Sequence, residues 1–161
     1  MDKRRRIALG MAAGALWALA VVWGGQRIDT GFLPINIVMP IAMIAPGLVL
    51  LAVIGRLAQR RFFDDTLIDG QDFAPGSPAW IDQRVLVNTA EQGLLALLLW
   101  PFVAITLGGG LAVVLGVAFG VARLAFWIGY HRSPPARAFG FAATFYPTVL
   151  ATLWALGVRF L

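Results

Sequence analysis

The sequence predicts an all-α integral membrane protein whose chain crosses the bilayer five times. Of its 161 residues, 60% are hydrophobic and only 13% are charged, and the mean hydropathy is +0.80. A chain this small cannot cover so much apolar surface with its own polar atoms, so a water-soluble globule is excluded. A helix needs about 20 apolar residues to cross the bilayer core, and five stretches have that length or nearly so.

The five stretches carry few or no charged residues. They are residues 7–25, 32–55, 85–107, 111–130 and 138–158. The first is long for the apolar core of a signal peptide, so we expect a retained span. Gly108–Gly110 leave room only for a tight hairpin between the third and fourth spans. Ser77 and Pro78 are typical of a helix N-cap and first turn, which predicts that the third helix starts near Pro78, before the membrane.

The basic residues predict the orientation. They cluster on one side of a five-span topology: residues 3–6, Arg56, Arg60, Arg61, Arg84, His131, Arg132 and Arg137. The other side receives only Arg27 and Arg159. The positive-inside rule then places the N-terminus in the cytoplasm and the C-terminus outside. Because these residues sit at the ends of apolar runs, the net charge of +5 does not indicate a nucleic-acid partner.

Several classes of site are excluded by composition. The chain has no cysteine and a single histidine, so disulfides, a thiolate nucleophile and Cys- or His-rich metal sites are not expected. The cytoplasmic connection, residues 59–77, carries four aspartates, but their spacing fits no EF-hand. We expect a solvated loop whose acids offset Arg60 and Arg61, and no metal site.

Two ionisable residues lie at membrane depth, where they are costly and indicate function by default. Glu91 lies six residues inside Val85, roughly 9 Å along the helix, and Arg123 lies seven residues inside Tyr130, roughly 10 Å. Both depths are measured from the cytoplasmic side. We therefore expect Glu91 and Arg123 to meet across two antiparallel helices.

Helical spacing places other polar residues beside these two. Arg84, Asn88 and Glu91 share one face of the third helix, because they are spaced i, i+4, i+7. Arg123, Trp127 and Tyr130 have the same spacing on the fourth helix.

This arrangement has two interpretations. One is a buried ion pair that fixes helix register, with Asn88 satisfying the remaining hydrogen bonds. The other is a polar pocket open to the cytoplasm, with positive charge from Arg84, Arg123, Arg132 and Arg137. Such a pocket suits a small zwitterion with carboxylates, because arginine binds carboxylates through two parallel hydrogen bonds.

These residues also resemble a known family. The segment RVLVNTAEQ at residues 84–92 resembles the signature helix of the MAPEG family (membrane-associated proteins in eicosanoid and glutathione metabolism). Residues 123–130 and 137–141 resemble its later part, especially in the bacterial branch. The similarity runs from about Ile35 to the C-terminus, over four spans.

The resemblance implies a homotrimer of four-helix bundles in a bacterial inner membrane. It implies glutathione as co-substrate, bound at subunit interfaces in a pocket open to the cytoplasm. The implied contacts are Arg84, Asn88, Glu91, Arg123 and Tyr130, with Arg137 as the catalytic cation that holds the thiolate. Members of the family transfer glutathione to lipophilic electrophiles, reduce lipid hydroperoxides, or isomerise or conjugate eicosanoids.

The chain departs from the family pattern at Val87, Phe126 and Ala138, where many members have polar residues. Residues 1–31 add an N-terminal transmembrane helix and a short outer loop to the MAPEG-like domain, residues 32–161.

We therefore keep two hypotheses. The first is a membrane-bound glutathione- or thiol-dependent transferase or peroxidase acting on a lipophilic electrophile or lipid hydroperoxide. The alternative is a non-catalytic accessory or lipid-binding member whose polar cluster is structural and whose first span binds a protein partner. A third possibility is a small transporter, but the chain lacks the internal repeat that is typical of that class.

Overall fold

A computed structural model describes residues 2–31 and 33–161, and all regular structure within them is helical. The five helices are α1 (Lys3–Gly25), α2 (Ile35–Phe62), α3 (Pro78–Leu107), α4 (Gly109–Arg132) and α5 (Pro134–Phe160). Each is long and apolar enough to cross a membrane, which confirms the all-α, five-span prediction. The expected boundary at position 32 lies outside the described residues.

All five helices extend past the apolar stretches at the end predicted to be cytoplasmic, and α2 and α3 do so by the most residues. α2 continues through Arg60 and Arg61 to Phe62, so the connection is shorter than expected and covers residues 63–77. α3 begins at Pro78, and the Ser77 hydroxyl accepts a hydrogen bond from the Trp80 backbone N–H at 3.1 Å. The predicted cap is therefore confirmed, because this bond satisfies one of the free donors of the first turn.

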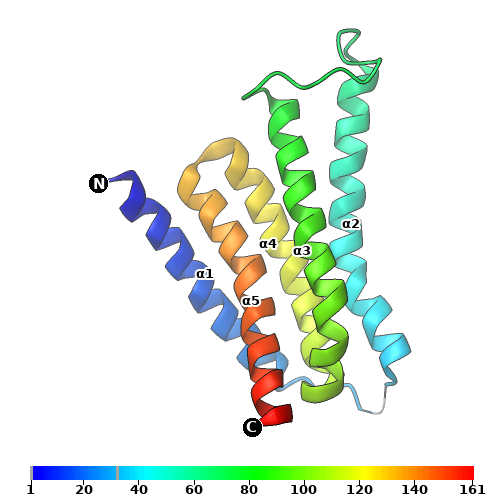
Figure 1. Cartoon of the computed structure of the whole chain (residues 1–161), viewed down its shortest axis with the longest axis vertical. Helices are drawn as coiled ribbons and strands as arrows, with labels where there is room; N and C mark the ends of the chain where they lie inside the picture. The colour runs from blue at the N-terminus through cyan, green and yellow to red at the C-terminus, as the bar shows by residue number, and fades with distance from the viewer. Residues whose placement is uncertain (1, 32) are drawn as a thin grey trace.

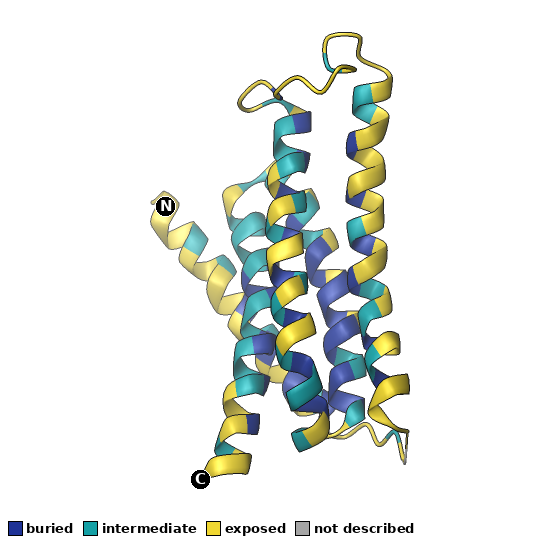
Figure 2. Cartoon of the chain, turned by 45° about the vertical axis from the view of Figure 1, so that its right-hand side comes forward, coloured by how far each residue is buried: buried dark blue, intermediate teal, exposed yellow. Residues whose placement is uncertain are grey.

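The helices pack around α4, which contacts all four others and has the largest buried share of any span (Figure 2). Within the described residues α1 contacts only α4 and α5. α1, α3 and α5 run in one direction and α2 and α4 in the other. The 63–77 connection, the α4–α5 turn and the start of α1 therefore lie toward the same end of the bundle (Figure 1).

Glycines allow the closest helix contacts. A Cβ atom at Gly116 on α4 would overlap the Ala42 carbonyl of α2, and one at Gly14 on α1 would overlap the Ala142 side chain of α5. Both glycines belong to GxxxG pairs, Gly10/Gly14 and Gly116/Gly120, and such pairs let two helices approach closely. Gly108, with φ +105°, makes the predicted tight hairpin between α3 and α4.

Candidate functional site

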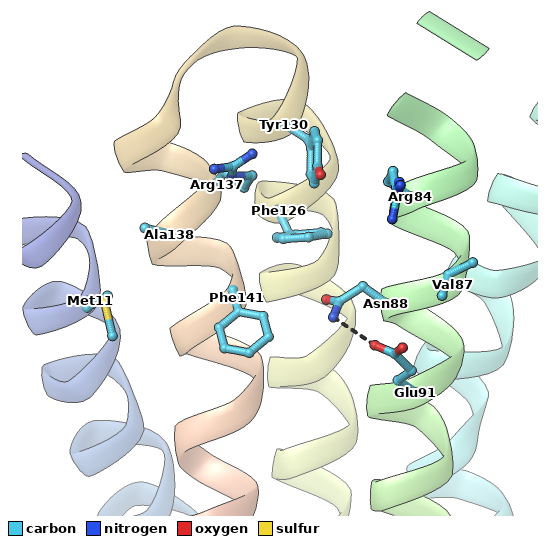
Figure 3. Close-up of a pocket in the computed structure, with 10 residues that line it drawn as sticks. All are labelled: Met11, Arg84, Val87, Asn88, Glu91, Phe126, Tyr130, Arg137, Ala138 and Phe141. Atoms are coloured by element: carbon cyan, nitrogen blue, oxygen red, sulfur yellow. Dashed lines mark hydrogen bonds between the residues drawn. The ribbon is translucent and has the colours of Figure 1, made fainter. Parts of the chain in front are cut away.

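A cavity of about 490 Å³ opens between α3 on one side and α1 and α5 on the other, with α4 behind it (Figure 3). Side chains from four helices line it. They are Met11, Arg84, Val87, Asn88, Glu91, Phe126, Tyr130, Arg137, Ala138 and Phe141.

Five of the six residues selected from the sequence line this cavity. Arg84, Asn88 and Glu91 lie along one face of α3, as their helical spacing predicts, while Tyr130 comes from α4 and Arg137 from α5. The sixth, Arg123, does not line the cavity. It is completely buried within the bundle.

The expected direct ion pair between Glu91 and Arg123 is wrong, because Asn88 stands between them. Arg123 Nη1 donates to Asn88 Oδ1 at 2.9 Å, and Asn88 Nδ2 donates to Glu91 Oε2 at 3.1 Å. No ion pair involves Glu91 within residues 2–31 and 33–161. Glu91 is exposed and lines the cavity. The amide of Asn88 connects its carboxylate to the buried guanidinium of Arg123.

Arg123 is held with few hydrogen bonds. Besides the Asn88 side chain, Nη1 approaches the Asn88 carbonyl at 3.5 Å, whereas Nε and Nη2 have no partner among the described residues. Its guanidinium lies 3.9 Å from the centre of the Phe126 ring, a cation–π contact. Arg123 therefore supports the cavity wall from behind, through Asn88 and Phe126.

Two arginines bring positive charge to the cavity itself. Arg84 lies over the Trp80 ring and Arg137 over the Tyr130 ring, each 4.8 Å from the ring centre. In the part of the chain that the structure describes, neither is in an ion pair. Arg132, from which we also expected charge, is exposed at the end of α4 and does not line this cavity. The cavity therefore offers two guanidinium groups without counterions beside the single carboxylate of Glu91.

The rest of the lining is apolar. Met11, Val87, Phe126, Ala138 and Phe141 surround the polar groups. This mixture is typical of small-molecule pockets, in which a few polar groups orient a ligand and apolar side chains cover it. The lining suits an amphiphilic ligand.

A second polar cluster was not expected from the sequence. The Asp82 carboxylate, 1% exposed, accepts hydrogen bonds at 2.7 Å from Arg60 Nε and Trp127 Nε1. It also lies 2.7 Å from His131 Nε2. The cluster joins α2, α3 and α4 at the end of the bundle where α3 begins and α4 ends. The i, i+4 pair of Trp127 and His131 was its one visible signal.

Arg60 and Arg61 therefore have other partners than the loop aspartates that we expected from the sequence. Arg60 pairs with Asp82 of α3, and Arg61 donates to the carbonyls of Leu67 and Gln71. Within the described residues, no group of three or more His, Cys, Asp or Glu side chains could hold a metal ion.

A comparison with protein families finds one model, that of the MAPEG family, which matches residues 39–157. No curated protein and no solved structure matches the chain. The matched region contains α3 and α4 whole and most of α2 and α5, whereas α1 lies outside it. Nine of the ten residues that line the cavity therefore fall within the match. The chain belongs to the MAPEG family.

Proposed function

We propose that the protein is a membrane-bound, glutathione- or thiol-dependent transferase or peroxidase acting on a lipophilic electrophile or lipid hydroperoxide. One observation carries the proposal. Residues Arg84, Asn88, Glu91, Tyr130 and Arg137, from three helices, converge on one cavity that also has apolar walls. The MAPEG family includes glutathione transferases and peroxidases.

The charges in the cavity fit a tripeptide thiol. Glutathione carries two carboxylates and one ammonium, and the cavity has two guanidinium groups and one carboxylate. Arginine binds carboxylates in two-pronged fashion, so Arg84 and Arg137 are the proposed carboxylate or thiolate partners. Glu91, oriented by Asn88, is the proposed partner of the ammonium.

The proposed chemistry is activation of the thiol by positive charge. A nearby cation stabilises a thiolate and lowers the pKa of the bound thiol, and we assign this role to Arg137. In transfer, the thiolate sulfur forms a bond to the electrophilic carbon, and the leaving group departs with its electron pair. In peroxide reduction, the thiolate attacks one oxygen of the O–O bond to give an alcohol and a sulfenate. A second thiol, together with the proton that the first thiol released, converts the sulfenate to a disulfide and water.

A homotrimer in a bacterial inner membrane, with the cavity open to the cytoplasm, completes the proposal. Glu91 is exposed on a single chain, although it lies roughly 9 Å inside the expected membrane boundary. A carboxylate facing lipid at that depth is costly. A neighbouring copy that covers this face of α3 would remove that cost.

The alternative is a non-catalytic member whose polar cluster is structural. The observation that favours it is the chain of hydrogen bonds from Arg123 through Asn88 to Glu91, in which these polar side chains are partners of one another. The lining at Val87, Phe126 and Ala138 also adds no polar group for a thiol.

Thermal unfolding of the detergent-purified protein against glutathione concentration tests the proposal. We expect a saturable rise in Tm for the wild type, because a ligand that binds only the folded state stabilises it. Arg84→Ala and Glu91→Gln should lose this rise. Arg159→Ala, which removes an exposed arginine at the far end of α5, should keep it.

The two functions predict different results. If glutathione leaves the wild-type Tm unchanged and Arg84→Ala and Glu91→Gln only lower it, the polar cluster is structural. If Tm rises, turnover is measured with an aromatic halide electrophile and with an organic hydroperoxide. Binding without turnover would favour the non-catalytic alternative.

A further inference from the structure

We propose that α1, the helix outside the family match, forms one wall of the site, and that Met11 contacts the lipophilic part of the bound ligand. The inference rests on the proposed function and deepens it. It assigns selection among lipophilic ligands to a helix that is additional to the MAPEG-like domain. The ligand class is a glutathione thioether with an extended apolar substituent, or the apolar co-substrate from which such a thioether forms.

α1 packs tightly against α5, one of the helices that line the site. A Cβ at Gly10 would overlap the Pro135 carbonyl, and one at Gly14 would overlap the Ala142 side chain. Between these two contacts, α5 supplies Arg137 and Phe141 to the cavity. The same turns of α5 therefore position both α1 and the cavity wall.

Met11 forms part of the cavity wall. Met11 follows Gly10 on α1 and is the only α1 side chain in the described residues that lines the cavity. α1 and α3 make no contact with each other in the described residues, and the cavity is lined by Met11 on one side and by Val87 and Glu91 on the other. Figure 3 shows Met11 on the far side of α5 from Glu91 and Asn88.

Met11 and Glu91 lie at similar depths along their helices. Met11 lies five residues beyond Arg6, the last basic residue of the N-terminus, or roughly 7.5 Å along the helix. Glu91 lies roughly 9 Å inside the same boundary. A ligand with its charged groups on Arg84, Arg137 and Glu91 would then direct an apolar substituent into the space beside Met11. The flexible thioether of methionine adapts to apolar groups of different shape, and Met11 is 40% exposed.

Cysteine protection tests the contact, since the chain contains no cysteine of its own. Met11→Cys is the probe, and Leu16→Cys is the matched control on α1, because Leu16 is 69% exposed and lines no described cavity. The rate of modification by N-ethylmaleimide is followed by intact mass in detergent. S-hexylglutathione and S-methylglutathione serve as ligands, because neither carries a free thiol.

We expect S-hexylglutathione to slow modification of Met11→Cys several-fold and S-methylglutathione to slow it much less. Neither ligand should change the rate for Leu16→Cys. A second pair of variants measures binding directly by calorimetry. Met11→Trp should change the affinity for S-hexylglutathione several-fold and leave that for S-methylglutathione unchanged, whereas Leu16→Trp should change neither.

The outcomes separate the two proposals. One outcome is that S-hexylglutathione raises the wild-type Tm, but does not protect Met11→Cys and binds Met11→Trp with the wild-type affinity. The role of α1 is then overturned and the proposed function stands. If neither thioether nor glutathione raises the wild-type Tm, the proposed function fails and the role of Met11 fails with it.

Discussion

Asn88 connects the cavity to the interior of the bundle. Its amide accepts from the buried guanidinium of Arg123 and donates to the exposed carboxylate of Glu91. Because the amide has distinct donor and acceptor ends, the charge of Arg123 determines which end faces Glu91. A residue that never reaches the cavity therefore orients one that does.

Replacing Asn88 should show this dependence. Asn88→Ala removes the one hydrogen bond, among the described residues, that Arg123 makes to another side chain, and an unsatisfied buried polar group costs about 1–3 kcal/mol. We expect a lower Tm in detergent. The double variant Asn88→Ala/Arg123→Met should lose less than the sum of its two single variants. Additive losses would mean that the two side chains do not depend on each other.

Asp82 is the second residue whose role is testable alone. Its carboxylate is buried against Arg60, Trp127 and His131, and removing one partner of a buried pair typically costs about 3 kcal/mol. Asp82→Asn should therefore lower Tm clearly. Asp69→Asn, at an exposed loop carboxylate, should change stability by less than about 0.5 kcal/mol. Equal effects of the two substitutions would contradict a structural role for the cluster.

At the scale of helices, α4 is the central element because small residues let its neighbours approach closely. Gly116 lies against the backbone of α2. Trp100 of α3 packs against Phe119 of α4 and donates a hydrogen bond to Thr148 of α5 at 3.2 Å. Apolar side chains have no hydrophobic advantage over lipid inside a bilayer, so close packing and hydrogen bonds hold such a bundle together.

Adding one methyl group should therefore distinguish packed glycines from unpacked ones. Gly116→Ala places a Cβ into the Ala42 carbonyl, and overpacking of this kind costs about 1–3 kcal/mol. Gly47→Ala, where nothing lies within 4 Å of the added Cβ, should leave the protein unchanged or stabilise it by about 0.5–1 kcal/mol. Thermal unfolding of both variants in one detergent measures the difference. Equal Tm values would contradict the α2–α4 contact.

At the scale of the whole molecule, the alternating helix directions collect the basic segments at one end. The start of α1, the end of α2 with Arg60 and Arg61, and the α4–α5 turn lie toward this end, whereas the end of α1 and the start of α2 lie at the other (Figure 1). The cavity is nearer the basic end, since Arg84, Tyr130 and Arg137 lie in the turns of α3, α4 and α5 closest to it.

Cysteine labelling in a bacterial membrane checks the proposed orientation. Asp69→Cys, in the 63–77 connection, should react with a membrane-impermeant maleimide only after the membrane is permeabilised. Asp29→Cys, in the connection between α1 and α2, should react in intact spheroplasts. Both positions are exposed, and the positive-inside rule gives the expected sides. The reverse pattern would place the cavity mouth on the outer side and remove the proposed supply of cytoplasmic thiol.

The sequence by itself determined the five spans, the Ser77 cap, the Gly108 hairpin and the shared face of Arg84, Asn88 and Glu91. These features depend on local hydropathy, on capping and backbone preferences, and on the 3.6-residue period of one helix. Matched depth also indicated that Arg123 reaches this face of α3, although its partner there is Asn88 and not Glu91.

Only the tertiary structure decided which side chains touch. It placed Asn88 between Glu91 and Arg123, gave Asp82 to Arg60, Trp127 and His131, and brought Met11 to the cavity. Each of these contacts depends on how helices rotate and incline against one another and on how far a side chain reaches. Spacing along a single helix contains no information about either.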